Sequence, residues 1–178
     1  MKRFTFVVFL GALLFSFAPA AQAKGVKADA YFGYSRVGAN MYAVNTPGMN
    51  GWQLAVDVRP IRLVGIEGDI SHYSQNVQGF SQQVLLAMAG PRVTVGAKGF
   101  DVFVHSLWGV AHENAKLTSF SGVGYDALSY ALGGGGDIPI AFGLKLRATA
   151  DYLGNGRAQS SQYSRSHFSA GVGLAYYF

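Results

Sequence analysis

The sequence contains no cysteine and few charged residues. Its 178 residues include 14 Lys or Arg and 9 Asp or Glu, so charged residues make up 13% of the chain, whereas an ordinary soluble protein has about 25%. The absence of cysteine excludes a disulfide framework and thiol chemistry. The low charge content leaves too few ionic side chains to cover a surface that faces water.

Long apolar runs are also missing beyond the N-terminal stretch, so no α-helix is predicted to span a membrane. At the N-terminus, Lys2 and Arg3 precede an uncharged apolar run from Phe4 to Phe17, and Ala21-Gln22-Ala23 supplies a small-x-small cleavage pattern. The run is shorter than the roughly 20 residues of a membrane-anchoring helix. We therefore predict that residues 1–23 are a removed export signal and that residues 24–178 form one domain.

Glycine and aromatic residues are abundant, with 24 Gly, 10 Tyr and 13 Phe. In the last segment, Phe168, Val172 and Leu174 fall on one side of an extended chain, while Ser169 and Gly171 fall on the other. Such a strand needs an apolar environment on one face and partners at both edges. With no spanning helix, a closed β-barrel is the structure that satisfies every backbone group in lipid.

Alternation of this kind predicts eight strands. They are Ala28–Val37, Gly51–Arg59, Ile61–Tyr73, Val84–Gly96, Phe100–His112, Asp126–Ile138, Ile140–Gly154 and Ser166–Phe178. The fold class is therefore all-β: an eight-stranded antiparallel up-and-down transmembrane β-barrel, preceded by a cleaved signal peptide. A soluble barrel is the competing interpretation, but it needs a well-charged outer face.

The connections alternate between tight and long. Tight turns are predicted at Arg59-Pro60-Ile61, Gly96–Gly99 and Ile138-Pro139-Ile140, and long polar loops at Asn40–Asn50, Gln75–Gln83, Glu113–Tyr125 and Asn155–Arg165. Outer-membrane barrels have short turns on the periplasmic side and long loops outside. We therefore expect four extracellular loops and two periplasmic termini.

Several motifs carry a family resemblance. They are Gly90-Pro91-Arg92, Leu132-Gly133-Gly134-Gly135-Gly136-Asp137, the stretch from Lys145 to Tyr152, and the final Tyr176-Tyr177-Phe178. Together with the eight-strand layout, they resemble the small outer-membrane β-barrel family related to the OmpA transmembrane domain and OmpX. The resemblance implies the outer membrane of a Gram-negative-type bacterium.

The same resemblance implies partners. Gly173, Tyr176 and Phe178 match the signal read by the barrel-assembly machinery, which is the expected partner during biogenesis. Outer-membrane lipid or lipopolysaccharide, and an unidentified extracellular partner, are expected afterwards. Arg36, Lys116, Arg157 and Arg165 lie in or beside the predicted loops, where they either contact lipopolysaccharide phosphates or form ordinary solvated surface. No nucleic acid partner is expected, because the cations are dispersed.

Charged residues fall on the face opposite the apolar one. The interior of an eight-stranded barrel is just large enough for its side chains, and isolated buried charges are strongly unfavourable, so opposite charges there must pair. We predict an ion-pair network that plugs the lumen. Its members are Asp57, Arg59, Glu67, Asp69, Arg92, Asp137, Lys145, Arg147 and Asp151, and Asp29, Asp101, His105 and His167 are also predicted to point inward. A proton or ion path through these groups, or an acid/base site among the carboxylates, is the alternative.

One motif suggests enzymatic chemistry. His72-Tyr73-Ser74 resembles the His-x-Ser pair of outer-membrane lipid A deacylases, in which Ser attacks an ester, His acts as base and a carboxylate orients the His. The following predicted strand begins Val84-Leu85-Leu86-Ala87-Met88 and supplies no acid. The four histidines show no metal-ligand spacing, so neither a metal nor another cofactor is expected. The predicted function is a structural or surface-interaction role, with a lipid-modifying esterase or a small-ion channel as alternatives.

Overall fold

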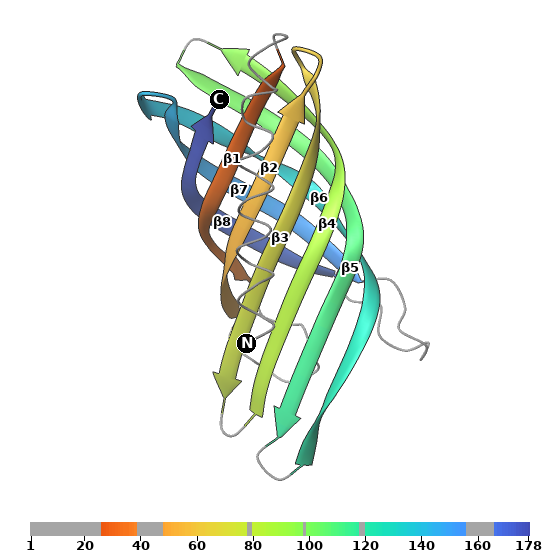
Figure 1. Cartoon of the computed structure of the whole chain (residues 1–178). Helices are drawn as coiled ribbons and strands as arrows, with labels where there is room; N and C mark the ends of the chain where they lie inside the picture. The colour runs from red at the N-terminus through yellow and green to blue at the C-terminus, as the bar shows by residue number, and fades with distance from the viewer. Residues whose placement is uncertain (1–25, 39–47, 78–79, 98, 118–119, 156–165) are drawn as a thin grey trace, which may run out of the picture.

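The computed structural model describes residues 26–38, 48–77, 80–97, 99–117, 120–155 and 166–178. The predicted export signal lies outside these residues. Eight strands are present: β1 (Lys27–Val37), β2 (Met49–Arg59), β3 (Val64–Val77), β4 (Phe80–Ala97), β5 (Phe100–Leu117), β6 (Phe120–Ala141), β7 (Leu144–Asn155) and β8 (Ser166–Tyr177). Each pairs antiparallel with the next, and β8 pairs with β1, which closes the barrel (Figure 1). The predicted fold class is confirmed.

The strands form because side-chain polarity alternates with a period of two. In β1, Tyr31 is 1% exposed, whereas its neighbour Phe32 is 61% exposed. The same alternation continues along the other strands, so one set of side chains fills the lumen and the other covers the outside. Within the described residues, no helix is long and apolar enough to cross a membrane.

Two of the predicted long loops are largely strand. β3 continues to Val77 and β4 begins at Phe80, so most of the predicted Gln75–Gln83 loop is paired. Likewise, β5 continues to Leu117 and β6 begins at Phe120, inside the predicted Glu113–Tyr125 loop. Polar residues there suggested loops, but polar side chains are compatible with a hairpin whose outer face meets water. The predicted loops around residues 39–47 and 156–165 lie outside the described residues.

The predicted turn at Ile138-Pro139-Ile140 is also wrong. These residues belong to β6, where Pro139 pairs with Lys145 beside a register irregularity. The chain reverses instead at Phe142 and Gly143, whose φ angles are 49° and 82°. Two consecutive positive φ values suit a tight hairpin turn whose twist matches that of the strands, and Gly143 adopts such an angle without strain.

Candidate functional site

The lumen contains a cluster of buried charged side chains. We define this lumen cluster as Asp29, Asp57, Arg59, Glu67, Arg92, His105, Asp137, Arg147 and Asp151. All of them occupy inward positions, and the parity of their strands brings them together. Arg59 is the last residue of β2, before the short turn, so the cluster lies towards the short-turn end of the barrel.

Three arginines hold the carboxylates of this cluster. Arg147 Nε lies 2.7 Å from Asp137 Oδ1, and Arg147 Nη2 lies 2.9 Å from Asp29 Oδ1. Arg59 Nη2 lies 2.9 Å from the other oxygen of Asp29 and Arg59 Nε lies 2.8 Å from Asp57 Oδ2. Arg92 Nη1 lies 2.9 Å from Glu67 Oε2. Because each guanidinium presents several donors, three cations link carboxylates from four strands.

His105 extends the cluster from β5. Its Nδ1 lies 3.1 Å from Glu67 Oε1 and its Nε2 lies 2.8 Å from Asp151 Oδ1, so the ring bridges two carboxylates. Beside it, the Phe103 ring lies 3.6 Å from the guanidinium carbon of Arg92. A Cβ at Gly135 would come within 2.7 Å of this ring, so the glycine provides the space that Phe103 occupies.

Neutral polar groups lie farther along the lumen. Asp69 accepts hydrogen bonds from Gln53 Nε2 at 2.8 Å and from the Ser71 hydroxyl. The hydroxyl groups of Ser35 and Tyr73 are 3.1 Å apart, and those of Ser35 and Ser169 are 3.0 Å apart. These side chains continue the filling of the lumen beyond the charged cluster, with hydrogen bonds between different strands.

An apolar layer then fills the lumen at the other end. We define it as Val37, Met49, Tyr73, Val84, Leu86, Met88, Leu107, Ala111, Ala131 and Leu153, all of which are buried together. Val37 ends β1 and Met49 begins β2, so the layer lies towards the end opposite the short turns. This layer was not predicted, because residues Val84 to Met88 are all apolar and the sequence there does not distinguish inward from outward positions.

The structure brings most of the sequence-predicted charged residues together. Asp57, Arg59, Glu67, Arg92, Asp137, Arg147 and Asp151 are members of the lumen cluster. Asp69 lies outside the lumen cluster, and its hydrogen-bond donors, Gln53 and Ser71, are uncharged. Lys145 pairs with Asp101 near the short turns, where their side chains are 17% and 23% exposed. Asp29 and His105, which were predicted to point inward, belong to the cluster as well. Tyr177, which was not predicted as a member of the network, donates a hydrogen bond to Asp137.

His72 and Ser74 lie on the outer face and do not form a triad with any described residue. The His72 ring stacks on Trp52, with centroids 5.9 Å apart. Ser74 is aligned with Asn50 on β2 and with Gln83 on β4. A histidine–carboxylate pair does occur elsewhere on the outer face, where His112 Nδ1 lies 2.6 Å from Asp126 Oδ1.

The residues of the predicted assembly signal lie on β8 and just after it. Tyr176 and Phe178 are exposed on the outer face, with ring centroids 5.1 Å apart. Gly173 is aligned with Gly33 at the seam between β8 and β1, and a Cβ there would come within 2.3 Å of Gly33 Cα. Gly173 therefore allows the closing strands to approach. Recognition by the assembly machinery stays a prediction.

Metal ligands do not converge in the described part of the chain, since no group of three or more His, Cys, Asp or Glu residues could hold an ion there. Of the four cations predicted at the outer rim, Arg36 lies exposed on β1. The side chain of Lys116, and residues 157 and 165, lie outside the described residues.

The outer face is apolar all round the barrel. Every strand exposes a large apolar side chain there, for example Phe32, Val58, Ile66, Val95, Val104, Leu132, Leu146 and Leu174. Tyr34 and Trp52 are paired on this face, and Phe100, Tyr176 and Phe178 lie near its short-turn end. A continuous apolar surface of this size is incompatible with water. A closed barrel with a filled interior and an apolar exterior defines the class of membrane-spanning β-barrels.

Comparison with known proteins supports this class at the level of fold. No protein-family model and no curated protein matches the sequence. Among solved structures, Neisserial surface protein A superposes with a TM-score of 0.61 at 11% identity, covering 86% of this chain and 97% of that one. Ail, the attachment invasion locus protein of Yersinia pestis, gives 0.58 at 18% identity, with coverage of 86% and 97%.

A third solved structure agrees. The N-terminal β-barrel domain of Pseudomonas aeruginosa OprF gives a TM-score of 0.53 at 16% identity, covering 87% of this chain and 98% of that one. At these identities the likeness concerns the fold alone. The fold implied by the resemblance in the sequence, that of the small outer-membrane barrels, is confirmed.

Proposed function

We propose that this chain is an integral outer-membrane barrel of a Gram-negative-type bacterium and that it acts through its outer surface as a structural or surface-interaction protein. The observation that carries this proposal is the filled lumen. A charged cluster and an apolar layer follow one another along the axis, and an eight-stranded barrel has no room for a wide water column beside them. The interior therefore serves stability, and the exposed surface is left to carry function.

The proposed orientation places the three short turns in the periplasm and the opposite end outside the cell. The β3–β4 and β5–β6 hairpins then point outward, together with Arg36. One solved structure of Ail is a complex with the heparin analogue sucrose octasulfate. By analogy, a sulfated polysaccharide is the extracellular partner that we propose for this chain, because it would meet the exposed cation at this end.

A matched pair of arginines tests the partner and the orientation together. Arg36 is exposed near the outer end, and Arg62 is exposed in the β2–β3 turn at the other end. In cells that display the protein, we expect Arg36→Ser to weaken binding to a heparin-coated surface and Arg62→Ser to leave it unchanged. If both variants and cells without the protein bound equally, a sulfated polysaccharide would be excluded as the partner. Loss with Arg62→Ser alone would reverse the orientation.

The channel alternative predicts ion flow through the lumen. The purified barrel in planar bilayers is expected to give no conductance steps, because both layers of the interior exclude a continuous water path. Regular unitary steps from the wild-type protein would favour the channel over the proposed role.

The esterase alternative depends on His72 and Ser74. Incubation with lipopolysaccharide is expected to release no fatty acid, because no described carboxylate lies on His72 to orient it as a base. Fatty acid release that disappears in Ser74→Ala would establish the enzyme.

A further inference from the structure

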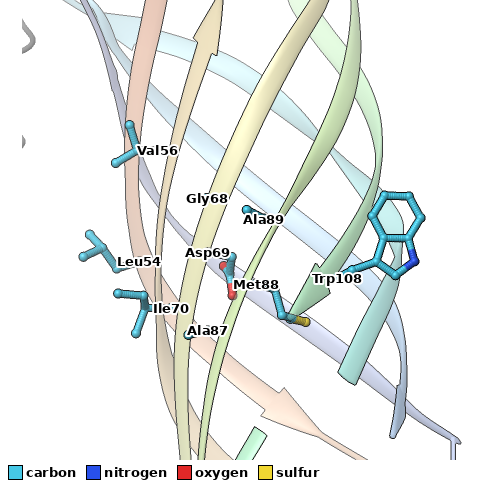
Figure 2. Close-up of a pocket in the computed structure, with 9 residues that line it drawn as sticks. All are labelled: Leu54, Val56, Gly68, Asp69, Ile70, Ala87, Met88, Ala89 and Trp108. Carbon is cyan, nitrogen blue, oxygen red and sulfur yellow. The ribbon is translucent and has the colours of Figure 1, made fainter. Parts of the chain in front are cut away.

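On the apolar exterior of the described strands, two grooves lie on either side of Trp108. The first has a volume of about 420 Å³ and is lined mainly by outer-face residues of β2, β3, β4 and β5. Figure 2 shows its layout: Leu54, Val56 and Ile70 stand on one side, Trp108 stands on the other, and small residues lie between them.

The floor of this first groove results from missing side chains. Gly68 and the alanines Ala87 and Ala89 occupy outer-face positions at which most strands carry a large apolar residue. A Cβ built at Gly68 would meet no atom within 4 Å, so the space above it is open. The groove is thus an apolar depression on the outer face, which contacts lipid if the chain spans the membrane as proposed.

The second groove, of about 480 Å³, runs along β5 and β6 on the other side of Trp108. Its lining follows the strand register: Trp108 is opposite Tyr130, and Val110 is opposite Leu128. The next outward pair in the same register is His112 and Asp126. An aromatic pair, an aliphatic pair and a polar pair therefore follow one another towards the outer end.

The polar pair can recognise hydroxyl groups. An ionised carboxylate only accepts hydrogen bonds, so His112 Nδ1 donates to Asp126 across 2.6 Å, and Nε2 is the second ring nitrogen that can bond a hydroxyl group. The side chains of His112 and Asp126 are 51% and 77% exposed. Asn114, two residues beyond His112 on β5, is aligned with Gln83 on β4, and this pair adds amides. This set offers donors and acceptors together, which suits a sugar hydroxyl, whereas Asp126 would repel a phosphate.

We propose that the two grooves hold two acyl chains of one glycolipid, with Trp108 between the chains and the sugar hydroxyls bound by His112 and Asp126. The inference rests on the membrane location proposed above. Two features select a lipid as the occupant. Both grooves lie on the lipid-facing surface, and the polar pair His112 and Asp126 follows the lining of the second groove in the strand register, as an amphiphile requires. A second copy of the chain would have to bury the Asp126 carboxylate against an apolar wall.

Tryptophan fluorescence can test this site, because the chain has two tryptophans, Trp52 and Trp108, and replacing one leaves the other as a single reporter. In Trp52→Phe, Trp108 alone reports quenching by brominated acyl chains. The protein is placed in phosphatidylcholine nanodiscs that contain brominated glucosyl diacylglycerol, brominated phosphatidylglycerol or brominated phosphatidylcholine. We expect the glycolipid to associate at Trp108 about fivefold more strongly than phosphatidylcholine, the factor that corresponds to one net hydrogen bond.

Matched variants locate the effect. In the Trp52→Phe background, Gly68→Ile fills the first groove and is expected to abolish the glycolipid preference. Gly136→Ile makes the same change on the outer face of β6, where a Cβ would lie 3.6 Å from the nearest atom, and is expected to leave the preference intact. Asp126→Asn and His112→Phe should lower the preference for the sugar headgroup without changing quenching by phosphatidylcholine. If Gly68→Ile fails to fold, Ala89→Leu fills the same groove.

Three results would overturn the site. They are equal quenching by all three lipids, a preference for phosphatidylglycerol, which would assign a phosphate ligand, or equal effects of Gly68→Ile and Gly136→Ile. Failure of the membrane location itself gives a different result, because Trp52, read in Trp108→Phe, would then not be quenched by any brominated lipid.

Discussion

At the scale of single residues, the arginine side chain explains how so many carboxylates are tolerated inside the barrel. Arg147 alone donates to both oxygens of Asp137 through Nε and Nη2, and its Nη2 also donates to Asp29 and, at 3.1 Å, to the Tyr177 hydroxyl. Lysine has the same charge but lacks the planar fork that reaches several acceptors at once. The identity of the cation, and not its charge alone, therefore determines whether the cluster is satisfied.

Arg147→Gln is predicted to destabilise the barrel by about 3–5 kcal/mol, because it removes the nearest cation of the buried Asp137 carboxylate and one of the two cations on Asp29. Arg147→Lys should recover only part of the loss. Lys145→Gln is the matched control on the same strand, and it should lose about 1 kcal/mol or less, because its ion pair with Asp101 is partly exposed. Urea unfolding in lipid vesicles measures all three. Equal losses for Arg147→Gln and Lys145→Gln would contradict this account of the cluster.

Side-chain parity predicted which charged residues point inward, but it could not predict their partners. Arg147 and Asp29 are 118 positions apart and lie on β7 and β1, which are separated by β8. Contacts of this kind cross the lumen, and their geometry depends on barrel closure and stagger, which no local pattern encodes. For the same reason, the sequence did not reveal that Asp69 lies on neutral partners.

At the scale of elements, the β6–β7 turn shows how two local signals can compete. Ile138-Pro139 and Phe142-Gly143 both contain a residue typical of turns, and the sequence-based prediction placed the turn at Pro139. The strand accommodates the proline beside a register irregularity, whereas the reversal uses two positive φ angles. Proline is tolerated at such irregular sites. Strand pairing with β7 therefore decided the position of the turn.

Substitutions in this turn are predicted to have opposite signs. Gly143→Ala should destabilise the barrel by about 1 kcal/mol, because its φ of 82° is unfavourable for a residue with a Cβ. Phe142→Asn should stabilise it by about 0.5–1 kcal/mol, because asparagine tolerates a φ of 49° and the 99% exposed ring packs against little of the chain. Both are measured by urea unfolding. A loss with Phe142→Asn would indicate that the ring is stabilised by lipid.

The extended hairpins show a further limit of local patterns. The outer end of the β3–β4 hairpin, past Ser74 on β3, is polar enough to suggest a loop, and so is the outer end of the β5–β6 hairpin, past His112 on β5. In both hairpins the strands nevertheless remain paired. A polar composition indicates that a segment is exposed to water, but it does not indicate whether the backbone of that segment is paired in a sheet. The number and order of the strands were predicted because they depend on alternation alone, whereas the strand ends depend on pairing.

At the scale of the whole molecule, the proposed role requires a closed lumen, and we propose that two barriers in series close it. The lumen cluster, towards the short turns, is the first. The apolar layer, towards the other end, is the second, since aliphatic side chains that line a narrow lumen exclude water and ions by dewetting. An ion that crosses the lumen must pass both layers, so opening one layer alone leaves the lumen closed by the other.

This arrangement predicts that substitutions in the two layers open the lumen only when they are combined. Arg147→Gln should not conduct in planar bilayers, because the apolar layer remains, and Leu86→Ser with Leu107→Ser should not conduct, because the lumen cluster remains. The variant with all three substitutions is expected to give conductance steps, since polar groups then line both constrictions. Gel mobility without heating verifies that each variant is folded before recording. Steps from Arg147→Gln alone would show that the lumen cluster is the sole seal, and a folded but silent triple variant would show that the remaining side chains close the pore without either layer.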